Sequence, residues 1–325
     1  MKKIISIIMA VAMLAVCLCG CGNPATTAEA NKSGIKIITT IFPEYDWVKS
    51  ILGDNPGNAD VIMLLDSGID LHNYQPSAED ILNVSTCDLF VYVGGESDEW
   101  VDDVLQSAQN HNLVAVNLLE VLGDAVKEEK MVEGMEEEEE ESEEGIEYDE
   151  HVWLSLKNAQ ILVNAIADSV AKIDAEHADA YKSNAEAYVK MLSELNAKYE
   201  EAANGAECKT VLFGDRFPFR YMFDDYGLEY YAAFAGCSAE SEASFETITF
   251  LAKKVDELGL HSVMTIEGTD HSIAETIIQN TESKDQTVLE MNSMQSVTAS
   301  DVKNGADYLA IMEKNLSSLE QALKG

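Results

Sequence analysis

Two histidines stand in contexts that suit a metal ligand. His72 lies after the apolar segment 61–65 in the stretch GIDLHNYQP, and His151 directly precedes a helical pattern in the stretch YDEHVWLS. Open α/β sheets place their ligand sites at the ends of strands, and both histidines flank such elements. Imidazole nitrogen is a common metal ligand, and two imidazoles with a carboxylate suit Zn²⁺ or Mn²⁺. The sequence therefore predicts a metal site that joins two distant loops.

Motifs for catalysis are missing from the sequence. It contains no His-Glu-x-x-His pair, Gly-x-Ser-x-Gly elbow, P-loop or Gly-x-Gly-x-x-Gly turn. Cys237, in the stretch GCSAE, has no histidine in a recognisable partner role, and the stretch is predicted to be a turn rather than a nucleophile site. A metallohydrolase would also need a general base beside a metal-bound water, which no motif supplies. We therefore expect a protein that is not an enzyme.

The charge balance is strongly acidic, with 21 Lys and Arg against 59 Asp and Glu and a net charge of −38. Such a surface repels phosphate backbones, which disfavours nucleic acid as a partner. Residues 128–150 hold 14 acidic side chains, and residues 136–141 are consecutive glutamates. Self-repulsion predicts a solvated loop here. This loop is either a solubilising insert or a loose collector of divalent cations directly before His151.

The first residues have the pattern of an export signal. Lys2 and Lys3 precede an apolar run at 4–18, which is too short to span a bilayer as a stable helix. The run ends in Leu-Cys-Gly-Cys, which resembles the lipobox at which bacterial lipoproteins are cut and acylated. We expect residues 1–20 to be removed, Cys21 to carry the lipid, and the small polar residues up to position 33 to form a flexible tether.

The remaining chain alternates short apolar runs with helical patterns, which predicts parallel α/β layers. The apolar runs predict strands at 36–42, 61–65, 89–94, 113–116, 210–213, 262–266 and 287–291. No Gly or Pro interrupts residues 157–203, and apolar side chains recur there at helical spacing. This stretch predicts two helices broken near Asp174, the second about 40 Å long at 1.5 Å per residue.

These patterns predict two Rossmann-like α/β lobes bridged by one long rigid helix. The N-terminal lobe is expected over 34–175 and includes the acidic loop, the bridging helix over 176–204, and the C-terminal lobe over 205–325. No internal repeat is obvious in the sequence.

Over residues 36–323 the motifs resemble one family, the metal-binding solute receptors of bacterial ABC importers for zinc and manganese. The order of the motifs is more specific than any one of them. They are IFP at 41–43, GIDLHNYQPSAED at 68–80, GGESDEW at 94–100, DEHVWL at 149–154, GDRF at 214–217, ESEAS at 240–244 and the closing segment 308–316. The resemblance implies two α/β lobes bridged by a long helix, with the metal in the cleft between them.

The resemblance also implies a ligand set. It assigns the first two ligands to His72 and His151. The third position falls at Gly214, which has no side chain to offer, so the adjacent Asp215 is the candidate. The fourth falls at Asn292, where a carboxylate is more usual. Glu267, after the predicted strand at 262–266, is a further carboxylate candidate. Hard oxygen donors favour Mn²⁺ and the two histidines favour Zn²⁺, and we place Zn²⁺ first.

The function implied is that of a lipid-anchored, monomeric receptor at the outer face of the cytoplasmic membrane. It would bind Zn²⁺ or Mn²⁺ as the transported ligand and deliver the ion to the permease of an ABC importer. The alternative is a cell-surface adhesion or structural lipoprotein that uses the glutamates at 136–141 as a cation-binding surface. Deleting 128–150 would abolish the function of such a lipoprotein, whereas His72→Ala would abolish that of a receptor.

Overall fold

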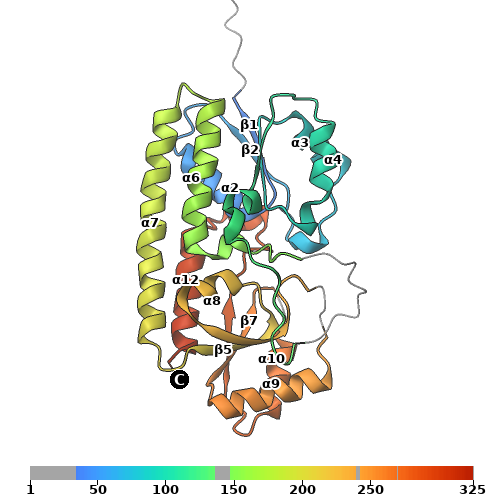
Figure 1. Cartoon of the computed structure of the whole chain (residues 1–325), viewed down its shortest axis with the longest axis vertical. Coiled ribbons are helices and arrows are strands. Elements are labelled where there is room, and N and C mark those ends of the chain that lie inside the picture. The colour runs from blue at the N-terminus through green and yellow to red at the C-terminus, as the bar shows by residue number, and fades with distance from the viewer. Residues whose placement is uncertain (1–33, 136–146, 239–241, 269, 325) are drawn as a thin grey trace, which may run out of the picture. The chain divides into compact units, whose positions relative to one another are not determined.

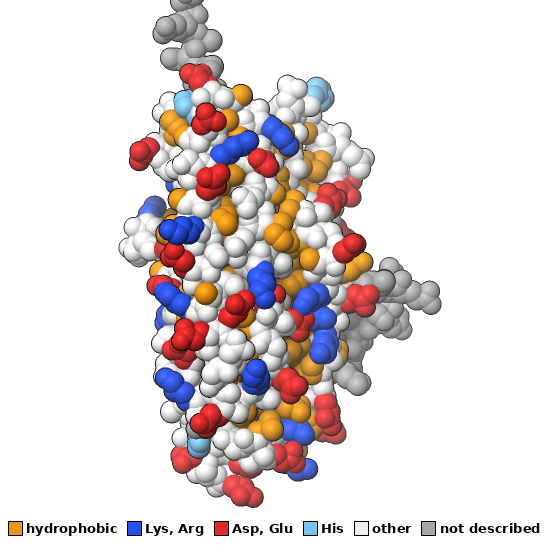
Figure 2. Space-filling view, turned by 60° about the vertical axis from the view of Figure 1, so that its left-hand side comes forward, with side chains coloured by type: hydrophobic (Ala, Val, Ile, Leu, Met, Phe, Trp, Pro, Cys, Tyr) orange, Lys and Arg blue, Asp and Glu red, His pale blue; other side chains and the backbone are white. Residues whose placement is uncertain are grey.

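The computed structural model describes residues 34–135, 147–238, 242–268 and 270–324. The predicted signal, the lipidated Cys21 and the tether lie outside the described residues. Within the described residues no helix combines the length and the apolar character needed to cross a membrane. On the face shown in Figure 2, acidic and basic side chains are interspersed.

The N-terminal half forms a four-stranded parallel sheet in the order β2-β1-β3-β4. Its strands are β1 (Lys36–Thr39), β2 (Asp60–Met63), β3 (Leu89–Tyr92) and β4 (Val114–Asn117). Every residue of the central strand β3 is buried, as expected for a sheet with both faces covered. The helices of this half are α2 (Phe42–Leu52), α3 (Ala78–Thr86), α4 (Trp100–Gln106), α5 (Leu118–Leu122) and α6 (Leu156–Ile173), with short 3₁₀ turns η1 (Leu71–Asn73), η2 (Glu96–Asp98), η3 (Gly123–Ala125) and η4 (Val152–Leu154).

The C-terminal half repeats this architecture with a parallel sheet in the order β6-β5-β7-β8. Both sheets thus place their second strand at the edge beside their first, although no repeat is obvious in the sequence. The strands are β5 (Thr210–Arg216), β6 (Glu229–Phe234), β7 (Ser262–Ile266) and β8 (Thr287–Met291). The helices are α8 (Arg220–Tyr226), α9 (Phe245–Leu258), α10 (Ser272–Asn280), α11 (Ala299–Lys303) and α12 (Tyr308–Ala322). All seven predicted strands are present, and β6 is an eighth that the prediction missed.

The long helix α7 (Ala178–Gly205) runs alongside helices of both halves (Figure 1). Its 28 residues correspond to about 42 Å at 1.5 Å per residue. Tyr188 donates from its hydroxyl to Asp46 of α2 at 3.1 Å, and Tyr199 donates to the Met312 carbonyl of α12 at 2.7 Å. The predicted break lies at Asp174, whose carboxylate accepts from the Tyr181 hydroxyl at 2.7 Å and so ties the turn to α7.

A single buried apolar cluster includes residues from both sheets and from α7. Trp153 is fully buried where the two halves meet: its indole nitrogen donates to the Ser293 carbonyl at 2.8 Å, and its own carbonyl accepts from Tyr308 at 2.6 Å. A continuous close-packed core resists sliding and opening. The two α/β lobes bridged by one long helix confirm the predicted fold class, while the exact domain boundaries stay a prediction.

Candidate metal centre

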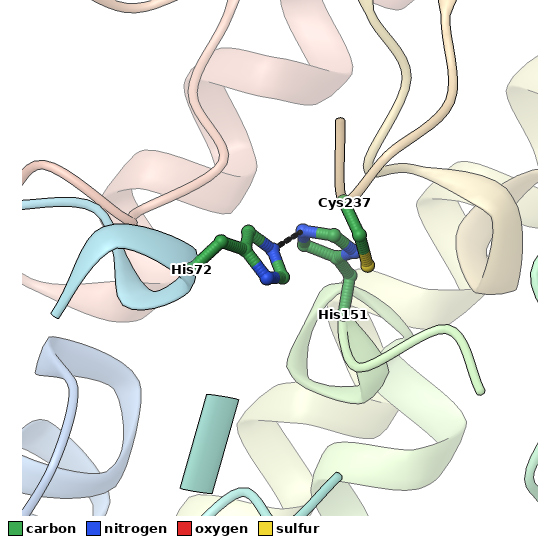
Figure 3. A group of neighbouring side chains, drawn as sticks. All are labelled: His72, His151 and Cys237. Carbon is green, nitrogen blue, oxygen red and sulfur yellow. Dashed lines mark hydrogen bonds between the residues drawn. The ribbon is translucent and has the colours of Figure 1, made fainter. Parts of the chain in front are cut away.

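His72 and His151 come together at the C-terminal edge of the first sheet. His72 lies in η1, in the loop that follows β2, and His151 immediately precedes η4. Their Nε2 atoms are 3.2 Å apart and their ring centroids 5.1 Å apart (Figure 3). Zn–N bonds of about 2.0–2.1 Å in a tetrahedral site place two nitrogens roughly 3.3 Å apart. The spacing of the two Nε2 atoms therefore matches one edge of a zinc coordination tetrahedron.

Two consecutive carboxylates orient these rings through their other nitrogens. Asp149 accepts from the His151 backbone nitrogen and lies 2.9 Å from His151 Nδ1. Glu150 lies 3.4 Å from His72 Nδ1, and the Ser97 hydroxyl lies 3.0 Å from the same nitrogen. Carboxylates in this position fix the tautomer and direction of a metal-binding imidazole. Both Nδ1 atoms are thus engaged, and both Nε2 atoms face a common point.

The surroundings of the two rings shift their pKa values in opposite directions. Burial, reinforced by the neighbouring His151, lowers the pKa of His72 to about 3. Burial also lowers the pKa of His151, but the hydrogen bond and charge of Asp149 outweigh it and raise that pKa above its ordinary value. His72 is therefore the ring that stays neutral, and His151 is the ring that is more readily protonated. A metal ion bound by both imidazoles would compete with protonation of His151.

The C-terminal lobe brings Cys237 beside this pair, with its sulfur next to the ring nitrogen of His151 that does not face His72 (Figure 3). Cys237 lies in a turn shortly after β6, and ligand atoms of His72, His151 and Cys237 all lie within 4.8 Å of one another. At position 236 only glycine fits without displacing its neighbours, because a Cβ there would lie 3.2 Å from two atoms of the His151 ring and 3.0 Å from the Phe217 carbonyl oxygen. Figure 3 shows the three side chains arriving from separate segments. Two imidazoles and a thiol form a set of donors typical of zinc.

Sequence reasoning predicted the turn at Cys237 correctly and did not place Cys237 near His72 and His151. Cys237 is one of three cysteines among the described residues, and none of the three forms a disulfide. Burial, with the charge of Glu129, raises the pKa of the Cys237 thiol well above its ordinary value. The available signal was a Gly-Cys-Ser turn directly after an apolar run, which is a strand end.

The described flanks of the acidic tract are solvated only in part: Glu128, Glu133 and Glu147 are exposed as predicted, whereas the residues nearest the site are buried. Asp149 and Glu150 are 1% and 2% exposed, and Met135 is buried as well. The two flanks pair with each other, since Glu129 donates from its backbone nitrogen to the Glu147 carbonyl at 2.8 Å. The Glu129 side chain accepts from the Gly236 nitrogen at 2.9 Å, beside Cys237. Backbone pairing and carboxylates used as hydrogen-bond acceptors explain why these acidic residues pack.

The other three predicted ligands hold the backbone at strand ends. Asp215 accepts from the backbone nitrogens of Arg216 and Ile266 at 2.9 and 3.3 Å. Glu267 accepts from the Ser293 backbone nitrogen at 2.7 Å and from its hydroxyl at 2.8 Å. Asn292 accepts from the Met294 nitrogen at 2.7 Å. Among the described residues, the group of possible ligands around His72 includes neither Asp215 nor Glu267.

Gly214, the third position implied by the resemblance, is fixed by packing. A Cβ on Gly214 would lie 2.6 Å from the Ala274 Cα, so the strand β5 approaches α10 too closely for a side chain. The side chain that approaches His72 and His151 from this lobe is Cys237, in the turn after β6.

Two parallel α/β lobes and the long helix that connects them define the class of fold, and His72, His151 and Cys237 form its candidate metal centre. The family model "ZnuA: Zinc-uptake complex component A periplasmic" matches residues 37–322, and the chain belongs to this family. The resemblance inferred from the motifs is thereby confirmed.

Two relatives illustrate the breadth of the match. The zinc-binding lipoprotein AdcA of Streptococcus pneumoniae R6 is 30% identical over 326 residues, which cover 99% of this chain and 61% of AdcA. The high-affinity zinc uptake system protein ZnuA of Bacillus subtilis is 29% identical over 310 residues, covering 93% of this chain and 92% of ZnuA. The chain spans about half the length of the streptococcal relatives that it matches, 55% for AdcA of Streptococcus pyogenes.

Solved structures agree with the fold. The Zn(II)-bound ZnuA-like domain of S. pneumoniae AdcA superposes with a TM-score of 0.70 at 28% identity and covers 90% of this chain and 100% of that domain. The metal-dependent lipoprotein YcdH of B. subtilis superposes with a TM-score of 0.73 at 26% identity, covering 89% of this chain and 99% of YcdH.

Proposed function

We propose that this protein is an extracytoplasmic receptor that binds Zn²⁺ through His72, His151 and Cys237 and delivers it to the permease of an ABC importer. The observation that carries the proposal is the meeting of three donor side chains from two lobes, with ligand atoms within 4.8 Å of one another. The relatives support it, because AdcA and ZnuA are named for zinc binding and zinc uptake. The receptor does no chemistry on the ion; it binds, carries and releases it.

The donor set favours Zn²⁺ over Mn²⁺. A thiolate and two imidazoles suit Zn²⁺, whereas Mn²⁺ prefers carboxylate, carbonyl and water oxygens. The carboxylates that would shift the preference toward Mn²⁺ are engaged with backbone nitrogens, as Asp215 and Glu267 are. With three protein ligands, a fourth position is left for water or for a further donor.

The lipid on Cys21 would hold the receptor, as a monomer, at the outer face of the cytoplasmic membrane. One acyl chain anchors only marginally, so we expect a lipid with more than one chain. The glutamates at 136–141 would raise the local concentration of cations near the site. The permease would then take up the ion from a receptor already at the membrane surface.

A calorimetric titration of metal-stripped protein with Zn²⁺ tests the proposal. We expect one tight site per chain, lost in His72→Ala and retained in His111→Ala, because His111 is exposed and outside the cluster of ligands. Weak, multiple sites that are unchanged in His72→Ala would instead assign zinc binding to the acidic tract and overturn the proposal.

A further inference from the structure

Arg216, the last residue of β5, reaches from the C-terminal lobe to the N-terminal lobe. Its Nη2 donates to Asp70 Oδ2 at 2.7 Å, and its Nη1 donates to the Ser238 carbonyl at 3.3 Å. Asp70 stands two residues before His72, and Ser238 directly follows Cys237. One guanidinium therefore holds the two loops that carry a ligand from each lobe.

Asp70 connects this ion pair to both histidines. Its Oδ1 accepts from the His72 backbone nitrogen at 3.1 Å and so caps η1. The side-chain amide of Gln295 links Asp70 to His151. In the orientation that satisfies its neighbours, the Gln295 nitrogen donates to the two Asp70 oxygens at 3.0 and 3.1 Å, and the Gln295 oxygen accepts from His151 Nε2 at 3.1 Å. All three candidate ligands are thus one or two contacts from the pair formed by Arg216 and Asp70.

The geometry requires an arginine. The carboxylate of Asp70 and the carbonyl of Ser238 are separate acceptors on different lobes, and the planar guanidinium offers donors to both at once. A lysine ammonium is a single point charge on a flexible stem and holds such a pair less firmly. Both partners of the ion pair are 17% exposed, so solvent screens the contact only in part.

An ion pair between the lobes matters because the candidate ligands belong to different lobes. The two histidines are on the first lobe and the thiol is in a turn of the second, so a metal ion that binds all three must also hold that turn against the His72 loop. Preorganising the donors removes that ordering cost from the binding step.

We propose that Arg216 is a positioning residue that clamps the Cys237 turn onto the His72 loop, so that the thiol meets the two imidazoles before the metal arrives. The inference rests on the proposed function, since it concerns the affinity of the same site. Arg216 itself does not bind the metal. Without it, the imidazoles would still capture an ion, and the thiol would join late or not at all.

The test compares Arg216→Met, Arg216→Lys and Asp70→Asn with the wild type, using Co²⁺ and Zn²⁺ as probes. Cobalt bound to a thiolate gives a charge-transfer absorption that cobalt bound to imidazole alone lacks, so the absorption per bound Co²⁺ reports the position of Cys237. Zinc affinity is measured by competition with a chelator. Arg220→Met is the matched control. This substitution removes the same charge, but Arg220 pairs with Asp224 inside its own helix α8 and not with the other lobe.

We expect Arg216→Met to weaken Zn²⁺ binding by about 10–100-fold, the range for residues that orient metal ligands, and to reduce the thiolate absorption per bound Co²⁺. Arg216→Lys should recover only part of the Zn²⁺ affinity and of the thiolate absorption. Asp70→Asn should also lower the Zn²⁺ affinity and the thiolate absorption, since asparagine keeps the cap on η1 and loses the ion pair. The double variant Arg216→Met with Asp70→Asn should bind Zn²⁺ no more weakly than the single variant with the lower affinity. Both substitutions remove the same ion pair, so their effects should not add.

Wild-type affinity and absorption in Arg216→Met would overturn the clamp and leave the proposed function intact. A lowered melting temperature of Arg216→Met with unchanged absorption per bound Co²⁺ would also overturn it, because Arg216 would then be only structural. If Arg216→Met does not fold, unchanged values in Asp70→Asn decide against the clamp. Absence of the thiolate absorption in the wild type would instead refute the proposed ligand set.

Discussion

The substitution Cys237→Ser tests whether a thiolate completes the site. Apparent binding energies of about 10–16 kcal/mol for four-ligand zinc sites correspond to about 3 kcal/mol per ligand, or about 10²-fold in Kd. Burial, with the charge of Glu129, raises the pKa of the Cys237 thiol, so zinc must first displace a proton from it. This opposing cost keeps the expected loss of affinity in Cys237→Ser at about 10²-fold rather than more.

Competition against a chelator measures the Zn²⁺ affinity, and a parallel titration measures Mn²⁺. We expect Cys237→Ser to weaken Zn²⁺ strongly and Mn²⁺ little, because a serine hydroxyl is a hard oxygen that suits Mn²⁺ no worse than sulfur does. Cys208→Ser is the control: Cys208 lies in the same lobe, donates to the Thr210 carbonyl at 3.4 Å and is outside the ligand cluster. Equal Zn²⁺ affinities of Cys237→Ser, Cys208→Ser and the wild type would refute a thiolate ligand.

Three further predictions follow from the contacts around the site and the bridging helix. Asp149→Asn should weaken Zn²⁺ binding about tenfold in a chelator competition, because the orienting charge at His151 Nδ1 is lost, and an unchanged affinity would contradict that role. Replacing the glutamates at 136–141 by glutamine should slow Zn²⁺ association at low salt in stopped-flow measurements and leave dissociation unchanged; equal association rates would exclude a steering role. Burial, with the charge of Asp307, raises the pKa of Asp46 to about 7. The folded state therefore holds the Asp46 proton more tightly than the unfolded state does. The stability that this proton contributes is fully present below about pH 4 and is lost as the pH rises through about 7. Asp46→Asn should therefore raise the free energy of unfolding of the metal-free protein by roughly 1–3 kcal/mol at pH 8 and change it little at pH 4, as denaturant titrations would show; a variant with the wild-type pH dependence would contradict this.

Most of the fold was predictable because its elements have strong local signals. Apolar runs bounded by polar turns gave the strands, and the uninterrupted helical spacing before Gly205 gave α7. The strand β6 (Glu229–Phe234) was missed although its sequence EYYAAF is apolar and follows a glycine turn. It directly follows the short helix α8 (Arg220–Tyr226), and two brief elements in succession give no long period to recognise.

The site was only half predictable, for a physical reason. His72 and His151 have chemistry and loop context that identify them one by one. The nearness of Cys237 to His72 and His151 depends on the close approach of two loops from different lobes, which no local pattern reports. Carboxylates at strand ends are equally ambiguous: Asp215 and Glu267 have the residue type and position of ligands, yet they accept from backbone nitrogens of neighbouring segments. Buried backbone donors need acceptors as much as a metal does.

The acidic tract therefore divides into two parts with different physical roles. At its end, Asp149 turns to the ring of His151 and Glu150 turns to the ring of His72, so two consecutive residues set the relative direction of both imidazoles. At its start, Glu129 accepts from the turn that carries Cys237. The contacts of Asp149 and Glu129 act at hydrogen-bond distance, Glu150 lies 3.4 Å from the His72 ring, and such partly or fully buried contacts are screened by salt less than exposed charges are. The glutamates at 136–141 are expected to act on an approaching cation through their long-range field. Substitutions at the ends of the tract should accordingly change equilibrium affinity, and substitutions in its middle should change only the rate of capture.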